Sequence, residues 1–356
     1  MSLLWNFTIQ DTSPFVAYSP FADGSFANGW QPWYTNSGFL KTPGEGGNGD
    51  SFHITSLPGA AFSLQFHGTG VDLYATTNSS YAVLIDDVEQ KLPAAGQTDN
   101  LVFKTTTLEN GPHNLTLTVN PAKATQQFAF DRAVVFAPVA KKPTSAFYDN
   151  TDKSLTYSGT WKSGSAAGIP NATVTHPFEQ TKTAKSSVSM TFTGAVGVAI
   201  NGPVLWGDWV YSVELDGKTT THNSSTYWKV PDALRFFQAG LDPNVSHTIT
   251  MANASPDMTL SLNSITLFKL PGAVLSVSDS AGSASTSASE SSGPSSPAAL
   301  PTSASQTSAD AASTPSTGSN SSAAPSAAPG SSDASKVHFG RIGIALGCGL
   351  LLLSLI

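Results

Sequence analysis

Short runs in which apolar and polar residues alternate recur along the chain up to about residue 272. Apolar side chains occupy every second position in FSLQFHG (62–68) and in VSMTFTG (188–194). The same pattern occurs in YAVLIDD (81–87) and in YSVELDG (211–217). Alternation with a period of two is typical of a β-strand with one face in a core. We therefore expect strands in all four places.

These runs belong to two sets that match each other in order. LENGPHNLTLTV (108–119) in the first half matches LDPNVSHTITM (241–251) in the second, and DRAVVF (131–136) matches NSITLF (263–268). Many short strands separated by Gly, Pro and Asn turns, without a helical period, are typical of β-sandwiches. The sequence thus predicts an all-β fold of two antiparallel β-sandwiches in tandem.

The repeat predicts two domains followed by a tail of different composition. The first β-sandwich domain is expected at residues 1–138 and the second at residues 146–272, with a hinge near APVAKKPTS (137–145). Residues 273–335 are mostly Ser, Ala, Thr and Pro and contain no aromatic residue. Such a segment cannot bury enough apolar area to offset its ordering entropy, so we expect a disordered stalk. Its composition favours O-glycosylation, and an unmodified linker is the alternative.

A hydrophobic segment follows the stalk at residues 336–356. It contains no charged residue from Ile342 through Leu350 to Ile356. A helix that crosses a bilayer needs about 20 apolar residues, so this stretch is short for a span. Two interpretations stay open: a signal for a glycosylphosphatidylinositol (GPI) anchor, or a single short transmembrane helix. Both predict that the protein binds to a membrane through this segment.

The composition argues against several functional classes. The net charge is −7, only 12% of the residues are charged, and Lys and Arg form no cluster, which argues against a nucleic-acid partner. The single cysteine, Cys348, excludes an intramolecular disulfide framework and a cysteine-based zinc site. No nucleophile elbow, HExxH motif, phosphate loop or dinucleotide fingerprint occurs. We therefore expect no cofactor, no metal and no catalytic residue.

Two signals disagree about the side of the membrane. The N-terminal segment MSLLWNFTIQDTSPF has neither the charged region nor the apolar region of a signal peptide. Sequons of the form N-x-[ST] nevertheless lie at Asn6, Asn78, Asn114, Asn171, Asn223, Asn244, Asn253 and Asn320. They favour a glycoprotein on the extracellular face whose start is truncated. The alternative is a tail-anchored protein that faces the cytosol.

The order of the repeated motifs is similar to that of a known group of proteins. TYSG-W, F-x-F-x-G and Y-x-V-x-[IL]-D, together with the duplication, the stalk and the terminal segment, resemble the tandem β-sandwich surface proteins of basidiomycete fungi. The resemblance covers about residues 1–272 and implies galactose-binding-like jelly rolls displayed at the cell surface. Members of the group generally begin with a secretion signal, and many continue into a cytoplasmic tail; this sequence shows neither.

Acidic and histidine residues recur at matching places in the two halves. Asp86, Asp87 and Asp216 follow alternating runs, where Asp and Gly favour a tight hairpin turn. Neighbouring residues on a strand point to opposite faces, so Asp86 and Asp87 form a poor catalytic pair. His113 and His247 each precede an alternating run, and we interpret both as residues that cap a turn.

Aromatic residues give the one positive indication of a binding site. A sugar ring has an apolar face and a polar rim, so carbohydrate sites combine an aromatic platform with amide or carboxylate groups. Trp30, Trp33 and Tyr34 lie in a polar segment rich in Gly and Asn. Trp206 and Trp209 flank Asp208 in GPVLWGDWVYS, and these three residues complete the set of candidates. The alternative is that these aromatic residues close the ends of the sandwiches.

The sequence therefore favours a membrane-anchored, non-catalytic surface protein that binds a glycan or a protein partner. A glycan-active hydrolase is the main alternative, and it would need two carboxylates about 5–10 Å apart. A tail-anchored protein facing the cytosol is the second alternative.

Overall fold

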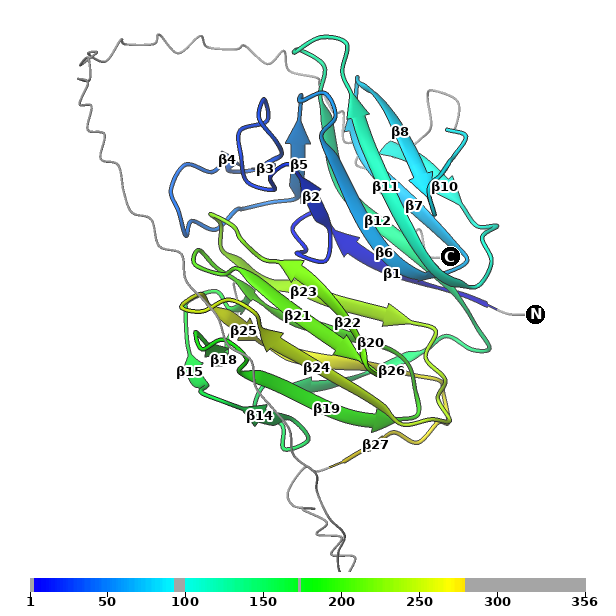
Figure 1. Ribbon diagram of the computed structural model, residues 1–356, viewed down its shortest axis with the longest axis vertical. Coiled ribbons are helices and arrows are strands. Elements are labelled where there is room, and N and C mark those ends of the chain that lie inside the picture. The colour runs from blue at the N-terminus through cyan, green and yellow to red at the C-terminus, as the bar shows by residue number, and fades with distance from the viewer. Residues whose placement is uncertain (1–2, 93–99, 172–173, 279–356) are drawn as a thin grey trace, which may run out of the picture. The chain divides into compact units, whose positions relative to one another are not determined.

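The computed structural model describes residues 3–92, 100–171 and 174–278 (Figure 1). Within these residues every regular element is a β-strand and every paired strand is antiparallel, which confirms the predicted all-β fold. No helix in the described part of the chain is long and apolar enough to cross a membrane. The predicted membrane segment at 336–356 lies outside the described residues.

The strands up to Val139 form two sheets. The first has the order β10-β7-β12-β5-β3-β4, and β1 pairs with β12. Its strands are β1 (Leu3–Gln10), β3 (Gln31–Tyr34), β4 (Gly38–Phe39), β5 (Ser51–Thr55), β7 (Gly70–Thr77), β10 (Leu101–Thr105) and β12 (Phe128–Val139). The second has the order β2-β6-β11-β8-β9. It contains β2 (Ala17–Ser19), β6 (Ala61–Gly68), β8 (Ser80–Ile85), β9 (Val88–Glu89) and β11 (Gly111–Asn120).

The strands from Thr144 onward form four further sheets. One has the order β13-β26-β20-β23, with β13 (Thr144–Asp149), β20 (Ala195–Val204), β23 (Val230–Ala239) and β26 (Ser264–Lys269). Another has the order β14-β19-β24-β21-β22, with β14 (Thr156–Ser158), β19 (Ser187–Thr193), β21 (Val210–Leu215), β22 (Lys218–Asn223) and β24 (His247–Asn253). The short strands β15 (Lys162–Gly164), β18 (Phe178–Thr181) and β25 (Leu260–Leu262) form a third, and β16 (Pro170–Asn171) and β17 (Val174–Thr175) form a fourth.

The duplication in the sequence extends to the pairing of the strands. The order β2-β6-β11-β8-β9 returns as β14-β19-β24-β21-β22, and β1-β12-β7-β10 returns as β13-β26-β20-β23. Side-chain hydrogen bonds repeat as well. The hydroxyl of Tyr18 donates to the carbonyl of Asp11 at 2.8 Å, and that of Tyr157 donates to the carbonyl of Asn150 at 2.7 Å. Asp11 and Asn150 are thus equivalent positions in the two halves.

The core forms on the faces that the alternating runs predict. On β8, Val83 and Ile85 are buried, and on β21, Tyr211 and Val213 are buried. In the first half, Phe62 of β6 stacks on Phe130 of β12 with ring centroids 4.2 Å apart. The two sheets of this half therefore pack face to face, as in a β-sandwich.

The two halves share one hydrophobic core and belong to one compact unit. At the contact, Phe7 of β1 stacks on Phe237 of β23, with ring centroids 3.7 Å apart and planes at 6°. The expected hinge at 137–145 is mostly strand, because β12 continues to Val139 and β13 begins at Thr144. The link between the two halves is residues 140–143, which lie within the stretch where the hinge was expected.

The fold also continues beyond residue 272. Ser276 and Val277, which the sequence assigned to the stalk, form β27 (Ser276–Val277) and pair with the end of β19. The rest of the predicted stalk, from residue 279 to residue 335, lies outside the described residues.

Candidate functional site

The repeated acidic residues form hairpin turns. Asp86 and Asp87 connect β8 to β9 with φ angles of 51° and 64°, and Asp216 and Gly217 connect β21 to β22 with φ angles of 52° and 81°. Two central residues with positive φ are what a two-residue type I′ hairpin requires. The predicted turn role is confirmed for both copies.

The two repeated histidines hold these turns in place. Nδ1 of His113 lies 2.6 Å from Oδ2 of Asp86, and its Nε2 lies 2.8 Å from the carbonyl oxygen of Glu109. His247 repeats both contacts, at 2.6 Å with Asp216 and at 2.9 Å with the carbonyl oxygen of Asp242. Each histidine therefore joins two neighbouring turns, which confirms the predicted capping role.

In the first half, the structure buries most of the predicted sugar-binding aromatics. Trp30 is fully buried, and its Nε1 donates to the carbonyl oxygens of Ser19 and Ala61 at 3.2 and 3.1 Å. Tyr34 is buried against Trp228 and Leu40. These side chains cannot contact a ligand in the folded protein, so Trp30 and Tyr34 are withdrawn as site residues.

Trp33 is partly exposed, and its ring lies 5.8 Å from that of Phe52. It is thus the one candidate aromatic of the first half that reaches the surface in the described structure.

In the second half, the loop between β20 and β21 exposes two tryptophans and buries the aspartate between them. The exposed fractions of Trp206 and Trp209 are 64% and 45%, whereas that of Asp208 is 1%. Oδ2 of Asp208 accepts a hydrogen bond of 2.7 Å from Nη2 of Arg235, and both side chains are fully buried. Asp208 therefore anchors the loop and cannot bind a sugar as predicted.

Burial and the arginine act on Asp208 in opposite directions. Burial raises the pKa of Asp208, the charge and the hydrogen bond of Arg235 lower it, and the net result is a pKa raised to about 6. The carboxylate is therefore ionised at neutral pH and pairs with the guanidinium as a buried ion pair.

The predicted glycosylation sites separate into two groups. Those with exposed side chains are Asn6, Asn78, Asn114, Asn171, Asn223 and Asn244. Asn253 has an exposed fraction of 2%, and its Nδ2, the atom that would carry a glycan, donates to the carbonyl oxygen of Met258 at 2.9 Å. The prediction for Asn253 is therefore wrong for the folded chain, and Asn320 lies outside the described residues.

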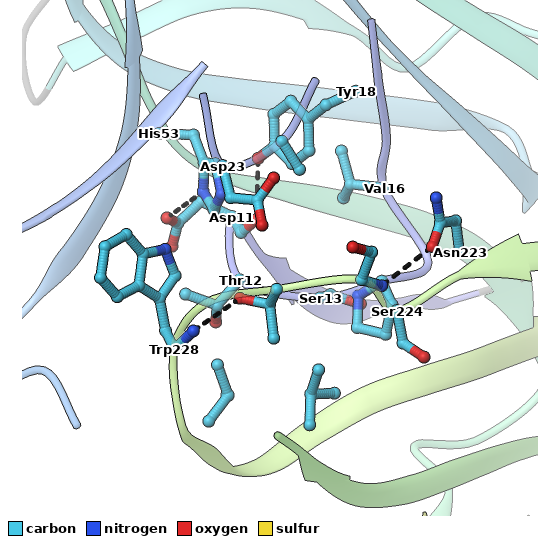
Figure 2. Close-up of a pocket in the computed structure, with 16 residues that line it drawn as sticks. Asp11, Thr12, Ser13, Val16, Tyr18, Asp23, His53, Asn223, Ser224 and Trp228 are labelled. Atoms are coloured by element: carbon cyan, nitrogen blue, oxygen red, sulfur yellow. Dashed lines mark hydrogen bonds and ion pairs between the residues drawn. The ribbon is translucent and has the colours of Figure 1, made fainter. Parts of the chain in front are cut away.

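A small polar cavity lies where the two halves meet (Figure 2). His53, whose Nδ1 lies 2.8 Å from Oδ2 of the buried Asp11, lines it from the first half. Ser224 and Trp228 line it from the second half. Its volume of about 40 Å³ has room for a water molecule or two and not for a sugar ring.

A much larger cavity opens at the edge of the second half, and we call it the Asn150 cavity. Its volume of about 430 Å³ falls in the range of about 300–1,000 Å³ that small-ligand sites occupy. The side chains that give it chemical character are Phe147, Asp149, Asn150, His176, Asp232 and Asn263. They come from β13, β23 and the loops beside them, so the fold gathers residues that are more than a hundred positions apart.

The Asn150 cavity combines an aromatic surface with hydrogen-bond acceptors. Phe147 lines it with an exposed fraction of 68%. Asn150 is buried, and its Oδ1 has no hydrogen-bond partner in the described structure. Asp149 and Asp232 are exposed and present carboxylates to the same space. A buried acceptor without a partner is costly, and a ligand donor that reached it would offset this cost.

The residue of the first half that corresponds to Ser264 is a cation. Arg132 occupies the place of Ser264 in the repeat; it forms an ion pair with Asp131, and its guanidinium lies 4.1 Å from the ring centroid of Tyr74. In the second half these positions are held by Ser264 and Asn263, which line the cavity. The two halves therefore differ in side-chain size and charge at this position.

The sequence interpretation missed this cavity. The one signal within reach was the difference between the repeats: Asp131-Arg132 in the first copy becomes Asn263-Ser264 in the second. In the described part of the chain, no group of three or more His, Cys, Asp or Glu side chains is arranged to hold a metal ion.

Comparisons with known proteins give weak structural likenesses. No family model matches the chain, and no curated protein matches it. Among solved structures, a Paenibacillus xanthan lyase matches with a TM-score of 0.26 and 14% identity, over 76% of this chain and 25% of the lyase. A cycloalternan-forming enzyme from Listeria monocytogenes, in complex with a pentasaccharide, matches with a TM-score of 0.22 and 13% identity, over 63% and 20%.

The tandem CBM22 domains of Xyn10C from Paenibacillus barcinonensis match with a TM-score of 0.17 and 13% identity, over 63% of this chain and 80% of theirs. The chain thus spans about a quarter of the lyase and a fifth of the Listeria enzyme. TM-scores this low do not establish a shared fold, so neither the fold nor the function of this protein follows from them.

Proposed function

We propose that this protein is a non-catalytic glycan-binding protein and that a sugar binds in the Asn150 cavity. The observation that carries the proposal is a cavity of about 430 Å³ lined by the exposed ring of Phe147 and by the buried Asn150, whose Oδ1 has no hydrogen-bond partner in the described structure. An apolar platform next to a few fixed polar groups suits a ring with one apolar face and a polar rim.

The polar groups of the cavity can accept hydrogen bonds from the polar rim of the sugar. Hydroxyl groups of a pyranose can donate to Oδ1 of Asn150 and to the carboxylates of Asp149 and Asp232. Hydrogen bonds to charged acceptors are shorter and stronger than neutral ones, so two carboxylates add affinity as well as orientation.

The test is binding of the full-length chain, kept in a mild detergent, to a glycan array. The protein should come from a host that does not N-glycosylate, because Asn171 lines the cavity and is a sequon. Phe147→Ala should weaken binding at least tenfold, which is about 1.4 kcal/mol. Phe21→Ala is the matched control, since Phe21 is also an exposed phenylalanine, at 59%, and does not line the cavity.

The exposed tryptophans remain a second surface to test on the same array. Trp206→Ala/Trp209→Ala should leave binding unchanged if the Asn150 cavity is the site. If this variant loses binding while Phe147→Ala keeps it, the glycan binds at the loop between β20 and β21 instead of in the Asn150 cavity. Absence of binding to every glycan would end the proposal.

A glycan-active hydrolase is the second candidate, favoured by one observation. Asp149 and Asp232 line one cavity, and glycosidases use a pair of carboxylates across the scissile bond. New reducing ends released from a bound oligosaccharide, and lost in both Asp149→Asn and Asp232→Asn, would replace the binding proposal. Binding without any product in long incubations would support it.

We also propose that the two halves are tandem galactose-binding-like jelly rolls displayed on the outside of a cell, as in the basidiomycete surface proteins that the sequence resembles. The Ser- and Thr-rich sequence after residue 278 and the apolar residues from Ile342 to Ile356 support a stalk and a membrane anchor. Deglycosylation of the native protein should increase its mobility on a gel. Protease added to intact cells should release the folded unit, and resistance to it would favour the tail-anchored cytosolic alternative.

A further inference from the structure

The polar side chains around the Asn150 cavity use their donors inside the fold. Nδ2 of Asn150 donates to the carbonyl oxygens of Pro177 at 2.8 Å and of Asn263 at 3.2 Å. An amide nitrogen has two hydrogens, so both are used and only the acceptor Oδ1 is left. A ligand that meets Asn150 must therefore bring a donor.

The neighbouring side chains repeat this arrangement. Nδ2 of Asn263 donates to the carbonyl oxygen of Pro231 at 3.1 Å and to Oδ1 of Asp232 at 2.7 Å. The amide and the hydroxyl of Thr151 both donate to Oδ1 of Asp149, at 2.8 and 2.6 Å. Each carboxylate thus keeps its second oxygen for a ligand.

The charge around the cavity is negative. Asp149 and Asp232 line it, and none of its described lining residues is Lys or Arg. The hydrogen bonds from the Thr151 hydroxyl and amide lower the pKa of Asp149, so this carboxylate stays ionised at neutral and mildly acidic pH. Burial raises the pKa of Asp232 above its ordinary value of 3.8, although the hydrogen bond from Asn263 opposes this shift. His176, Asn171 and Ser264 add groups that can donate or accept, but no fixed positive charge balances the site.

We propose that the sugar bound in the Asn150 cavity is a hexosamine with a free amino group, as in an oligosaccharide of deacetylated glucosamine. This inference rests on the proposed function and names its ligand class. A protonated amine offers three donors to the carboxylates of Asp149 and Asp232 and to Oδ1 of Asn150, and its bonds to the two carboxylates are charge-assisted. The exposed ring of Phe147 adds a favourable surface for a cation.

The negative charge and the acceptors of the cavity should weaken the binding of related sugars. N-acetylation removes the positive charge and two of the three donors, and it adds a carbonyl acceptor that faces carboxylates. A uronic acid brings a negative charge into a negative cavity, where like charges repel. A neutral hexose keeps hydroxyl donors but loses the ionic attraction. Its affinity should therefore lie between that of the hexosamine and that of the uronic acid.

The experiment compares four tetrasaccharides by calorimetry on the unglycosylated full-length chain in detergent: glucosamine, N-acetylglucosamine, glucose and galacturonic acid oligomers. The glucosamine oligomer should bind at least tenfold more tightly than the glucose oligomer, and added salt should reduce this difference. The galacturonate oligomer should show no binding.

Three variants separate charge from folding. Asp232→Asn keeps the shape of the side chain and should reduce the preference for the glucosamine oligomer, and Asp149→Asn/Asp232→Asn should bring that oligomer to the affinity of the glucose oligomer. Asp87→Asn is the matched control, because it removes an exposed carboxylate from a first-half turn where asparagine tolerates the positive φ of 64°. It should leave the preference intact, and thermal denaturation checks that all three variants fold.

The outcomes distinguish this inference from the proposed function. Equal or tighter binding of the glucose or N-acetylglucosamine oligomer, lost in Phe147→Ala, would overturn the amine preference and leave glycan binding in place. A preference for the amine that survives Asp232→Asn and Asp149→Asn together would also overturn it. If none of the four tetrasaccharides binds and no glycan on the array binds, both the amine preference and the proposed glycan-binding function are wrong.

Discussion

In the turn that closes β8, His113 Nδ1 lies 2.6 Å from Asp86 Oδ2, and the other nitrogen of His113 lies 2.8 Å from the carbonyl oxygen of Glu109. Both ring nitrogens face oxygen acceptors, which only the protonated imidazole can satisfy with two donors. Burial lowers the pKa of His113, but the hydrogen bonds to Asp86 and Glu109 raise it more, so it lies above its ordinary value of 6.5. The hydrogen bonds from His113 and from the amide of Asn114 lower the pKa of Asp86 below 3.8.

This pair should make the stability of the protein depend on pH. A histidine with a raised pKa stabilises the fold fully below about pH 6.5 and loses this contribution as the pH rises through its folded pKa. An aspartate with a lowered pKa stabilises the fold above about pH 4 and loses this contribution as the pH falls. Because Asp86 is half exposed, we expect His113→Gln to cost about 0.5 kcal/mol more at pH 5.5 than at pH 8.5. Urea denaturation at the two pH values measures the difference.

The control for this prediction is the same substitution in an Asp86→Asn background. There the charge partner is gone, so His113→Gln should cost nearly the same at both pH values. An undiminished pH dependence in that background would assign the effect to another group.

The buried ion pair of Asp208 and Arg235 should contribute to the stability of the fold and not to ligand binding. Asp208→Ala leaves a fully buried guanidinium without its carboxylate, which typically costs about 3–5 kcal/mol. The double substitution Asp208→Leu/Arg235→Met removes both charges and should be less destabilised than Asp208→Leu alone. Chemical denaturation of the three variants gives these free energies. A mild effect of Asp208→Ala combined with a selective loss of glycan binding would restore Asp208 as a ligand residue.

The aromatic contact between the halves should make them unfold together. Phe237 is buried against Phe7, so Phe237→Ala should cost about 3–5 kcal/mol through lost contacts and a residual cavity. We expect one cooperative transition in the parent protein by scanning calorimetry. Two separated transitions in the parent would show that the contact does not couple the halves. Phe147→Ala, which removes an exposed ring, should change the stability by no more than about 0.5 kcal/mol.

The sequence predicted the strands and the turns because their signals are local. Alternation in YAVLIDD and YSVELDG specifies which face is buried, and an Asp followed by Asp or Gly suits positive φ wherever the turn lies in the fold. The matching of the two halves predicted the order of these strands for the same reason. Such features need no knowledge of distant partners.

The site residues depended on distant partners and could not be predicted in this way. Trp30 and Trp206 both lie in polar, Gly-containing segments, yet one is fully buried and the other is 64% exposed, because only Trp30 lies under the facing sheet. Asp208 lies between two tryptophans in the sequence, which suggests a sugar ligand. In the folded chain its carboxylate instead accepts a hydrogen bond from Arg235, which is distant in sequence. The Asn150 cavity is lined by residues that run from Phe147 to Ser264, and a space between segments so far apart leaves no local pattern in the sequence.

Two sequons should behave in opposite ways when the chain passes through a secretory pathway. Asn253 is buried and its Nδ2 is hydrogen-bonded, so mass spectrometry of glycopeptides should find it unmodified, while the exposed Asn114 carries a glycan. Asn171 is exposed and lines the Asn150 cavity, so a glycan on it would occupy the mouth of the proposed site.

The prediction for Asn171 is a gain of binding on removal of its sequon. In protein from a glycosylating host, Asn171→Gln should bind the preferred oligosaccharide at least tenfold more tightly than the parent, because the bulky modification no longer competes for the cavity. In protein from a host that does not N-glycosylate, the same substitution should have little effect, and Asn114→Gln should have little effect in either host. A modified Asn171 that leaves the affinity unchanged would argue that the ligand binds elsewhere on the protein, and a glycan found on Asn253 would contradict its buried position.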